Sequence, residues 1–303
     1  MLRGTKTKGF TIIELLTVMS IIIILIALLV PGLNRVRKLA KDLTQKVAFY
    51  DIEKALADYR NDHQDEFPDS NALDFDTPRK PYCGAMKLCE ALVGQDGMGY
   101  HQDSKLRAIP GLDSDGDPMY PFDLCALRSP DNYLPVHIRS IKKRTRYLEN
   151  LSVKPARLDM LYGIPNPSPY DASGVCAVLT DVYKRAPITA CAALAGEKIG
   201  MPILYYKADV RKNSHDANEP TVPNPDNIYD YRDNDFLVKL GLPWDASTIP
   251  PLFSDPGRWF YERITNQEVT STPTPFRKEE YIMISAGWDG TFGTNDDIFN
   301  FRR

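Results

Sequence analysis

The chain has 303 residues, 43% of them hydrophobic and 25% charged, which is the composition of a folded protein with an apolar core. Its formal net charge is −3, although Arg3, Lys6 and Lys8 bring three positive charges before the first acid. The rest of the chain is therefore acidic, which argues against a nucleic-acid-binding protein. Length alone allows one large domain or two small ones.

The first predicted element is a membrane-spanning helix over residues 10–30, which read FTIIELLTVMSIIIILIALLV. A helix of this length spans about 30 Å, the thickness of the hydrocarbon core of a bilayer. Because the basic residues precede it, we expect the N-terminus to stay in the cytoplasm and the rest of the chain to cross the membrane. A secretory signal peptide fits less well, since its apolar core has about 7–15 residues and is followed by a small-residue cleavage site.

Glu14 distinguishes this segment from a plain membrane anchor. An acid near the centre of a membrane helix costs about 2.5–3.5 kcal/mol, so it is usually functional and paired. The stretch KGFTIIELL at 8–16 resembles the processing site of type IV pilins and type II secretion pseudopilins. The resemblance implies that a prepilin peptidase removes residues 1–9 by cutting between Gly9 and Phe10, and then methylates the new N-terminus. It also implies that the Glu14 carboxylate meets the terminal amine of a neighbouring subunit during assembly.

The helix is predicted to continue as an amphipathic segment over residues 31–62 and to pack on a globular body over residues 63–303. Pro31 resembles a family position before which the helix of assembled filaments is often unwound, since a proline removes one helical hydrogen bond. The basic residues that follow are interpreted as a solvated face or a lipid-headgroup contact. Pro68 disfavours helical geometry in the residue before it and predicts a stop near that point. The apolar stripe recurs at spacings of three and four: Leu33, Val36, Ala40, Leu43, Val47, and then, with a small phase shift, Ile52, Leu56 and Tyr59.

Residues 69–200 are predicted to form a large loop-rich insertion with one short helix over 88–93, before Gly94. A run of acids at 113–117 has the initial spacing of an EF-hand loop, but proline and leucine stand where that loop needs glycine and glutamate. A polar turn is therefore favoured. A basic run is interpreted as a solvated face; it comprises Lys142, Lys143, Arg144 and Arg146.

Two strands are predicted at 201–208 and 280–285, where β-forming residues gather. Together with the long helix they indicate an α+β chain. The resemblance implies the pilin fold, in which the long N-terminal helix packs on an antiparallel sheet. The five cysteines show neither a CxxC motif nor zinc spacing, and two interpretations remain open for them. Outside the cytoplasm one or two disulfides would form, or several are simply small buried apolar residues.

The loop at 285–298 is punctuated by glycines and rich in oxygen donors. Calcium takes six to eight oxygens, and such a loop can bend to present them. The alternative is a hairpin turn between the strand at 280–285 and a last strand at 297–301. The stretch resembles the calcium loop at the end of the major pseudopilin of type II secretion. That resemblance implies a structural Ca²⁺ held, with backbone carbonyls, by Asp289, Thr294, Asp296 and Asp297.

No enzyme is expected, because the four histidines lie far apart and the HExxH, GxSxG, P-loop and GxGxxG motifs are absent. The resemblance implies a structural subunit of a type II secretion pseudopilus-like filament. Such a subunit first spans the inner membrane once, with its body in the periplasm, and then joins a periplasmic or cell-surface filament. Its partners would be further copies of itself, the prepilin peptidase, the inner-membrane assembly platform and minor pseudopilins. A type IV pilus pilin or minor pilin, used in adhesion, motility or DNA uptake, and an anchored enzyme are the alternatives.

Overall fold

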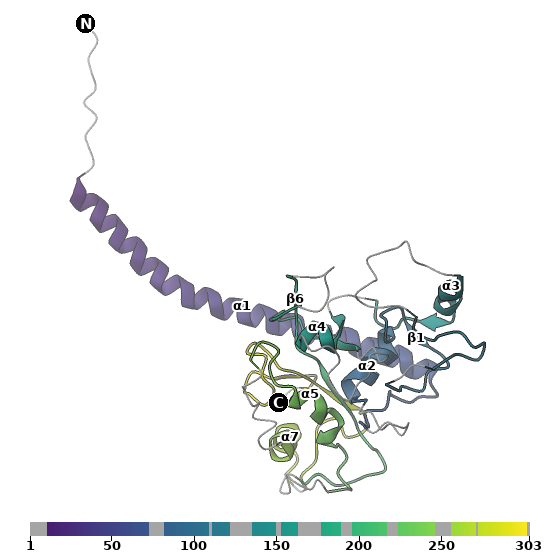
Figure 1. The fold of residues 1–303 in the computed structure, drawn as a ribbon. Helices are drawn as coiled ribbons and strands as arrows, with labels where there is room; N and C mark the ends of the chain where they lie inside the picture. Colours follow the sequence, from purple (N-terminus) through teal and green to yellow (C-terminus); the bar gives the residue numbers. More distant parts are fainter. Residues whose placement is uncertain are drawn as a thin grey trace. The chain divides into compact units, whose positions relative to one another are not determined.

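Two compact units make up the chain, Met1–Leu43 and Thr44–Arg303, and we call the second one the body. The described part of the chain combines helices with small antiparallel sheets, so it is α+β, as predicted (Figure 1). The computed structural model describes residues 11–72, 82–108, 111–121, 135–149, 153–162, 177–188, 196–216, 224–245, 256–270 and 272–301.

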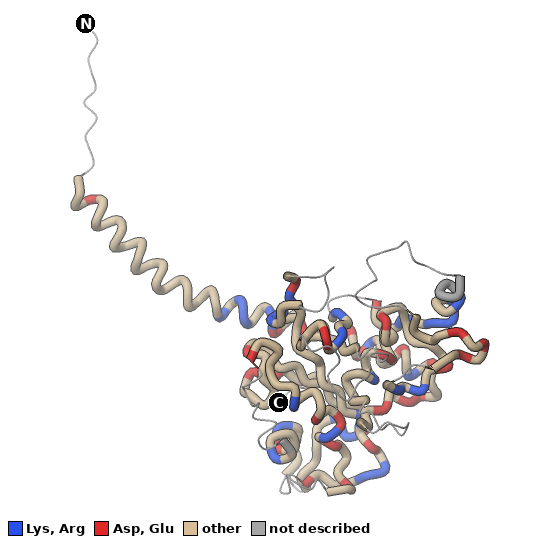
Figure 2. Tube along the Cα trace, viewed as in Figure 1, with Lys and Arg blue, Asp and Glu red and all other residues tan. Residues whose placement is uncertain are grey.

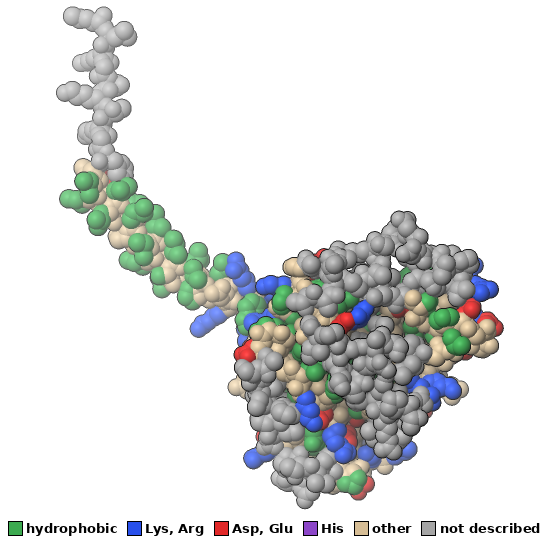
Figure 3. Space-filling view, in the orientation of Figure 1, with side chains coloured by type: hydrophobic (Ala, Val, Ile, Leu, Met, Phe, Trp, Pro, Cys, Tyr) green, Lys and Arg blue, Asp and Glu red, His purple; other side chains and the backbone are tan. Residues whose placement is uncertain are grey.

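Helix α1 runs without interruption over Ile12–Asp62, close to the predicted 10–62. Its N-terminal part is long and apolar enough to cross a membrane, and none of the apolar stretch is buried within the chain. Figure 3 shows apolar side chains along this part of the helix, and Figure 2 shows an acid near its start. In the sequence this acid is Glu14. The helix also continues through Pro31, so the unwinding that the resemblance implies for filaments is not present in the single chain.

The C-terminal part of α1 buries one stripe in the body. The stripe has helical spacing and continues the predicted Ile52, Leu56 and Tyr59. The earlier part of the predicted stripe is exposed instead, because burial begins only at Gln45 and in another phase; these residues are Leu33, Val36, Ala40, Leu43 and Val47. The helix ends at Asp62, before Pro68, as predicted. The buried residues are Gln45, Ala48, Phe49, Ile52, Ala55, Leu56 and Tyr59.

A three-stranded antiparallel sheet forms the centre of the body, in the order β7 (Leu204–Lys207), β8 (Tyr281–Ser285) and β9 (Ile298–Phe299). This confirms both predicted strands, with Tyr205 opposite Met283. Successive side chains in a strand point to opposite faces, and here each face is buried in a separate apolar cluster. Tyr205 and Met283 share a cluster with α1, whereas Tyr206 and Ile282 belong to the other one. The sheet therefore divides two cores, and α1 covers one of them.

The predicted insertion contains more regular structure than expected. Helix α2 (Gly84–Val93) is buried at every position and packs against β4 (Ala177–Thr180) and β7, so it is part of the core. It ends at Gly94 as predicted, where φ is +76° and a Cβ would lie 2.2 Å from the Gly99 carbonyl oxygen. Three two-stranded antiparallel ladders follow, pairing β1 (Tyr100–His101) with β2 (Arg144–Thr145), β3 (Lys154–Arg157) with β4 (Ala177–Thr180), and β5 (Ala186–Pro187) with β6 (Lys198–Ile199).

The remaining helices are short. The apolar cluster that contains Tyr206 and Ile282, which we call the second apolar cluster, packs residues of η4 (Tyr231–Asn234), α5 (Asp235–Lys239) and α7 (Pro256–Ile264) against its face of the sheet. Cys83 and Cys89 are buried free thiols, which supports the small-apolar interpretation for these two, and the other three cysteines lie outside the described residues. The other two short helices are α3 (Pro135–Lys142) and α4 (Leu158–Tyr162).

Candidate functional site

The first predicted site lies at the N-terminus of α1, where Thr11 and Glu14 bond in both directions. The Glu14 carboxylate accepts the backbone N–H of Thr11 at 2.9 Å and its hydroxyl at 2.7 Å. The Glu14 N–H donates to Thr11 Oγ1 at 3.2 Å. This is a capping box, which satisfies helix-end N–H groups that have no partner in the helix. Sequence reasoning missed it, although a Thr-x-x-Glu spacing before an apolar run is its signal.

The capping box gives Glu14 a local role that does not require its charge, since glutamine serves equally well at that position of the motif. The surrounding apolar side chains have no such local explanation: Ile12 is 83% exposed and Leu28 is 74% exposed. Pro31 lies within the helix, and its side chain is exposed as well. The processing residues Gly9 and Phe10 lie outside the described residues.

The second predicted site is the loop between β8 and β9, and its four predicted residues are brought together. Asp296 links three of them, because it accepts the Asp289 N–H through Oδ2 at 2.9 Å and the Thr294 hydroxyl through Oδ1 at 2.9 Å. Asp297 is close enough to the other two acids for their charges to raise its pKa. The hairpin interpretation is also correct, since β8 and β9 pair directly, with Ser285 opposite Ile298.

Negative charge in this loop is incompletely compensated. Asp297 Oδ2 accepts the Gly293 N–H at 2.9 Å, but Asp297 Oδ1 is buried and has no hydrogen-bond partner in the structure. Burial, and then the charges of Asp289 and Asp296, raise the pKa of Asp297 well above its usual value. Burial and the neighbouring Asp296 also raise the pKa of Asp289. A bound cation would remove this penalty, because it offers the buried oxygen a partner and neutralises the mutual repulsion.

The donor set suits calcium by its chemistry, since it consists of carboxylate and hydroxyl oxygens with no nitrogen or sulfur. The carboxylates now turn partly toward backbone N–H groups: Asp289 Oδ1, for example, accepts the Thr291 N–H at 2.7 Å. As the loop stands, no group of three or more His, Cys, Asp or Glu side chains in the described ranges is arranged to hold a metal ion. The residues that would hold Ca²⁺ are the four predicted ones, Asp289, Thr294, Asp296 and Asp297.

Several residues that support this loop were not predicted. Gly287 has φ +64°, and a Cβ there would lie 1.9 Å from the Asp296 carbonyl oxygen, so only glycine fits. Phe292, at 2% exposure, anchors the loop in the second apolar cluster. Asn295, one of the loop's oxygen donors, accepts a hydrogen bond from Arg263 of α7 at 2.5 Å. No local pattern in the sequence reveals that contact, because the two residues are far apart in the chain.

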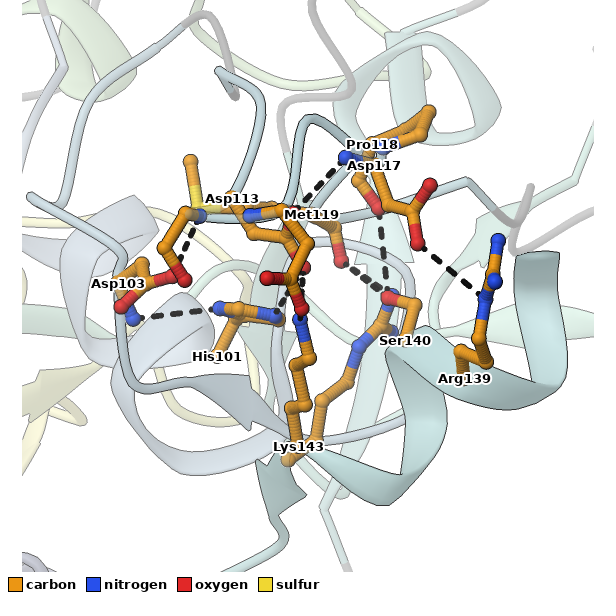
Figure 4. Close-up of polar contacts among 12 residues, drawn as sticks. His101, Asp103, Asp113, Asp117, Pro118, Met119, Arg139, Ser140 and Lys143 are labelled. Atoms are coloured by element: carbon orange, nitrogen blue, oxygen red, sulfur yellow. Dashed lines mark hydrogen bonds and ion pairs between the residues drawn. The ribbon is translucent and has the colours of Figure 1, made fainter.

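A separate polar network lies near β1 and α3 (Figure 4). The 113–117 stretch forms the predicted polar turn, since Asp113 Oδ1 accepts the N–H groups of Asp115 and Asp117 at 2.9 and 2.8 Å. Asp113 Oδ2 accepts Lys143 Nζ at 2.6 Å and lies 3.7 Å from His101 Nε2. These contacts tie the turn to the segment after α3.

The prediction that the basic run is a solvated face was wrong for Arg144. Its side chain and that of Asp96 are both fully buried, and Arg144 Nη1 donates to the two Asp96 oxygens at 2.9 and 2.8 Å. Arg144 Nη2 also donates to Ser140 Oγ at 2.6 Å and to the Met119 carbonyl. Removing such a group from water is tolerable only because each charged end is paired.

Comparisons with protein-family models, curated proteins and solved structures find no match for this chain.

Proposed function

We propose that the chain is a structural subunit of a helical filament of the type II secretion pseudopilus kind, anchored and assembled through the N-terminal part of α1. The observation that carries the proposal is the wholly exposed apolar stretch of α1 with one acid, Glu14, near its start. Burial of apolar surface stabilises by about 25 cal/mol per Å², so this helix requires a bilayer or other helices around it. In the membrane-bound subunit the bilayer would surround this helix, and in the filament the helices of neighbouring copies would surround it.

Glu14 is the proposed assembly contact. A carboxylate among apolar helices needs a positive partner, because an unpaired charge there costs several kcal/mol. Cleavage after Gly9 would create a terminal amine on Phe10, and the amine of a neighbouring copy is such a partner. The bonds between Glu14 and Thr11 leave this role possible, since a carboxylate has about four lone-pair sites and the described contacts use Oε2.

Calcium bound between β8 and β9 is the second part of the proposal. The ion would be held by Asp289, Thr294, Asp296 and Asp297, and it would supply positive charge to a loop whose acids now repel one another. Its proposed role is structural, because the loop joins two strands of the central sheet and anchors Phe292 in the core. No reaction is assigned to it.

The experiment that tests this function is intact-mass measurement of the protein extracted from membranes of cells that contain the prepilin peptidase. The expected chain begins at Phe10 and carries one added methyl group. A matched Gly9→Leu variant should keep residues 1–9 and stay in the membrane as a monomer. A native chain that still begins at Met1, or one cut after Val30 as a secreted protein would be, contradicts the proposal.

A further inference from the structure

The fold brings a positive side chain, Arg263 of α7, to the loop between β8 and β9. The loop itself, residues 285–298, carries three acids and no lysine or arginine. Arg263 Nη2 donates to Asn295 Oδ1 at 2.5 Å. Asn295 lies between Thr294 and Asp296, two of the four proposed calcium ligands. The guanidinium therefore contacts the loop in the middle of its oxygen donors.

Contacts outside the loop fix the position of Arg263. It lies in the last turn of α7, where the helix dipole favours a positive side chain. Its guanidinium carbon is 5.4 Å from the centre of the Trp259 ring, one turn earlier in the same helix. That ring stacks on Phe299 of β9. Arg263 is thus held by α7 and the central sheet, so its position does not depend on a cation in the loop.

The charge of Arg263 acts on the acids of the loop. Among the described residues, no acid forms an ion pair with it. Its charge lowers the pKa of Asp297, whereas burial and the charges of Asp289 and Asp296 raise it. The guanidinium does not bond to the buried Asp297 Oδ1, which has no hydrogen-bond partner in the structure. Arg263 therefore compensates the negative charge of the loop only in part.

We propose that Arg263 is the counter-charge of this loop when calcium is absent, and that it sets the calcium affinity of the loop by opposing the ion. A guanidinium and Ca²⁺ that are attracted by the same acids repel each other, so each weakens the effect of the other. The calcium part of the inference rests on the site proposed above, and the counter-charge part does not. If Arg263 only anchored Asn295, its loss would weaken calcium binding or leave it unchanged.

Calorimetric titration of the full chain with calcium, in a mild non-ionic detergent at mildly alkaline pH, tests the opposition. Arg263→Gln removes the charge but keeps an amide that can donate to Asn295. This variant should bind calcium about fivefold or more tightly than the native protein, and raised salt should narrow the difference. Arg263→Lys keeps the charge and should stay near the native affinity. Equal or weaker binding by Arg263→Gln would overturn the proposal.

Arg185→Gln is the matched control for the calcium titration. It changes the net charge equally, and Arg185 also contacts the loop, with its guanidinium carbon 5.3 Å from the centre of the Trp288 ring. Because Trp288 is not one of the proposed ligands, this variant should keep the native calcium affinity. An equal gain in affinity in both variants would show an effect of net charge alone, and the assignment to Arg263 would be wrong.

A double-mutant cycle in chelator, measured by urea unfolding, tests the counter-charge without calcium. Arg263→Gln should lower the free energy of unfolding in the native background and clearly less in the Asp297→Asn background, where one charge that it compensates is gone. Equal losses in the two backgrounds would contradict the counter-charge, whatever the calcium result. If the native protein binds no calcium but the cycle shows this coupling, the calcium site fails and the counter-charge role stands.

Discussion

The two carboxylate oxygens of Asp297 have different surroundings: Oδ2 accepts the Gly293 N–H at 2.9 Å, whereas Oδ1 is buried with no hydrogen-bond partner in the structure. Burying a carboxylate oxygen in this way costs stability unless a partner is supplied. The buried oxygen and the two neighbouring acids together are the physical reason to expect a cation in the loop between β8 and β9.

Calcium should raise the melting temperature of the native protein relative to the chelated protein. A ligand at 100 times its Kd adds about 2.7 kcal/mol, which corresponds to roughly 5–10 °C for a body of this size. Asp297→Asn should lose this gain, yet melt no lower than the native protein in chelator, because the substitution removes a buried and repelled charge. Asp226→Asn, which makes the same change at an exposed acid outside the loop, should keep the gain. Identical melting curves with calcium and with chelator would contradict the site.

Gly287→Ala should disrupt the same loop through its backbone. The φ of +64° and a Cβ placed 1.9 Å from the Asp296 carbonyl oxygen both oppose the change. Gly116 is a matched control, because its φ is +82° but nothing lies within 4 Å of its added Cβ. Gly116→Ala should therefore cost only the conformational penalty of about 1–2 kcal/mol. Gly287→Ala should cost clearly more in urea unfolding and lose the calcium gain, and equal costs would argue against the described loop conformation.

Arg144→Ala should destabilise the body by about 3–5 kcal/mol, because it leaves Asp96 charged and fully buried. The matched control is Arg146→Ala in the same basic run, whose side chain is exposed and whose loss should cost within about 0.5 kcal/mol. Urea unfolding followed by circular dichroism measures both. Similar losses for the two variants would mean that Arg144 is solvated, as the sequence alone predicts.

Stability should fall between about pH 4 and pH 7 through Asp233. Burial, aided by the charges of Asp230 and Asp69, raises the pKa of Asp233 from 3.8 to about 7, although the Ser70 hydroxyl at 2.5 Å opposes the shift. The folded state then binds more protons than the unfolded state across this window, so the free energy of unfolding decreases as pH rises. Asp233→Asn should raise the melting temperature at pH 8 more than at pH 5.

An exposed acid provides the comparison for that pH profile. Asp226→Asn is the matched substitution, because it makes the same change at a side chain that faces solvent. If the Asp233 and Asp226 variants show the same pH profile, the Asp233 carboxyl ionises as freely in the fold as in the unfolded chain.

The elements with local signals could be predicted from the sequence. Runs of β-forming residues predict β7 and β8, and hydrophobicity predicts α1, because each depends on neighbours in the sequence. The burial of Arg144 could not be predicted, since it depends on Asp96, which lies 48 residues earlier. Val47 was wrongly predicted to be buried for a related reason. Packing against the body sets which residues of α1 form the buried stripe, and the apolar residues before that packing begins are not subject to it.

The calcium loop also combines features that the sequence predicts with features that only the fold reveals. Its donors could be predicted because acids and glycines gather within a short stretch of sequence. The need for glycine at 287, and the contact between Asn295 and Arg263, follow only from the folded chain.

Glu14→Gln is the substitution that tests the central claim most directly. Glutamine preserves the capping box with Thr11 but removes the charge, whereas Glu14→Ala removes both. Filaments are sheared from cells that contain the assembly platform and the prepilin peptidase, then counted by electron microscopy, with the membrane-bound monomer measured alongside. If Glu14 pairs with the amine of a neighbouring subunit, Glu14→Gln accumulates in the membrane at native levels and forms no filaments. Native filament numbers from Glu14→Gln, with loss only in Glu14→Ala, would show that Glu14 acts as a helix cap and contradict the assembly role.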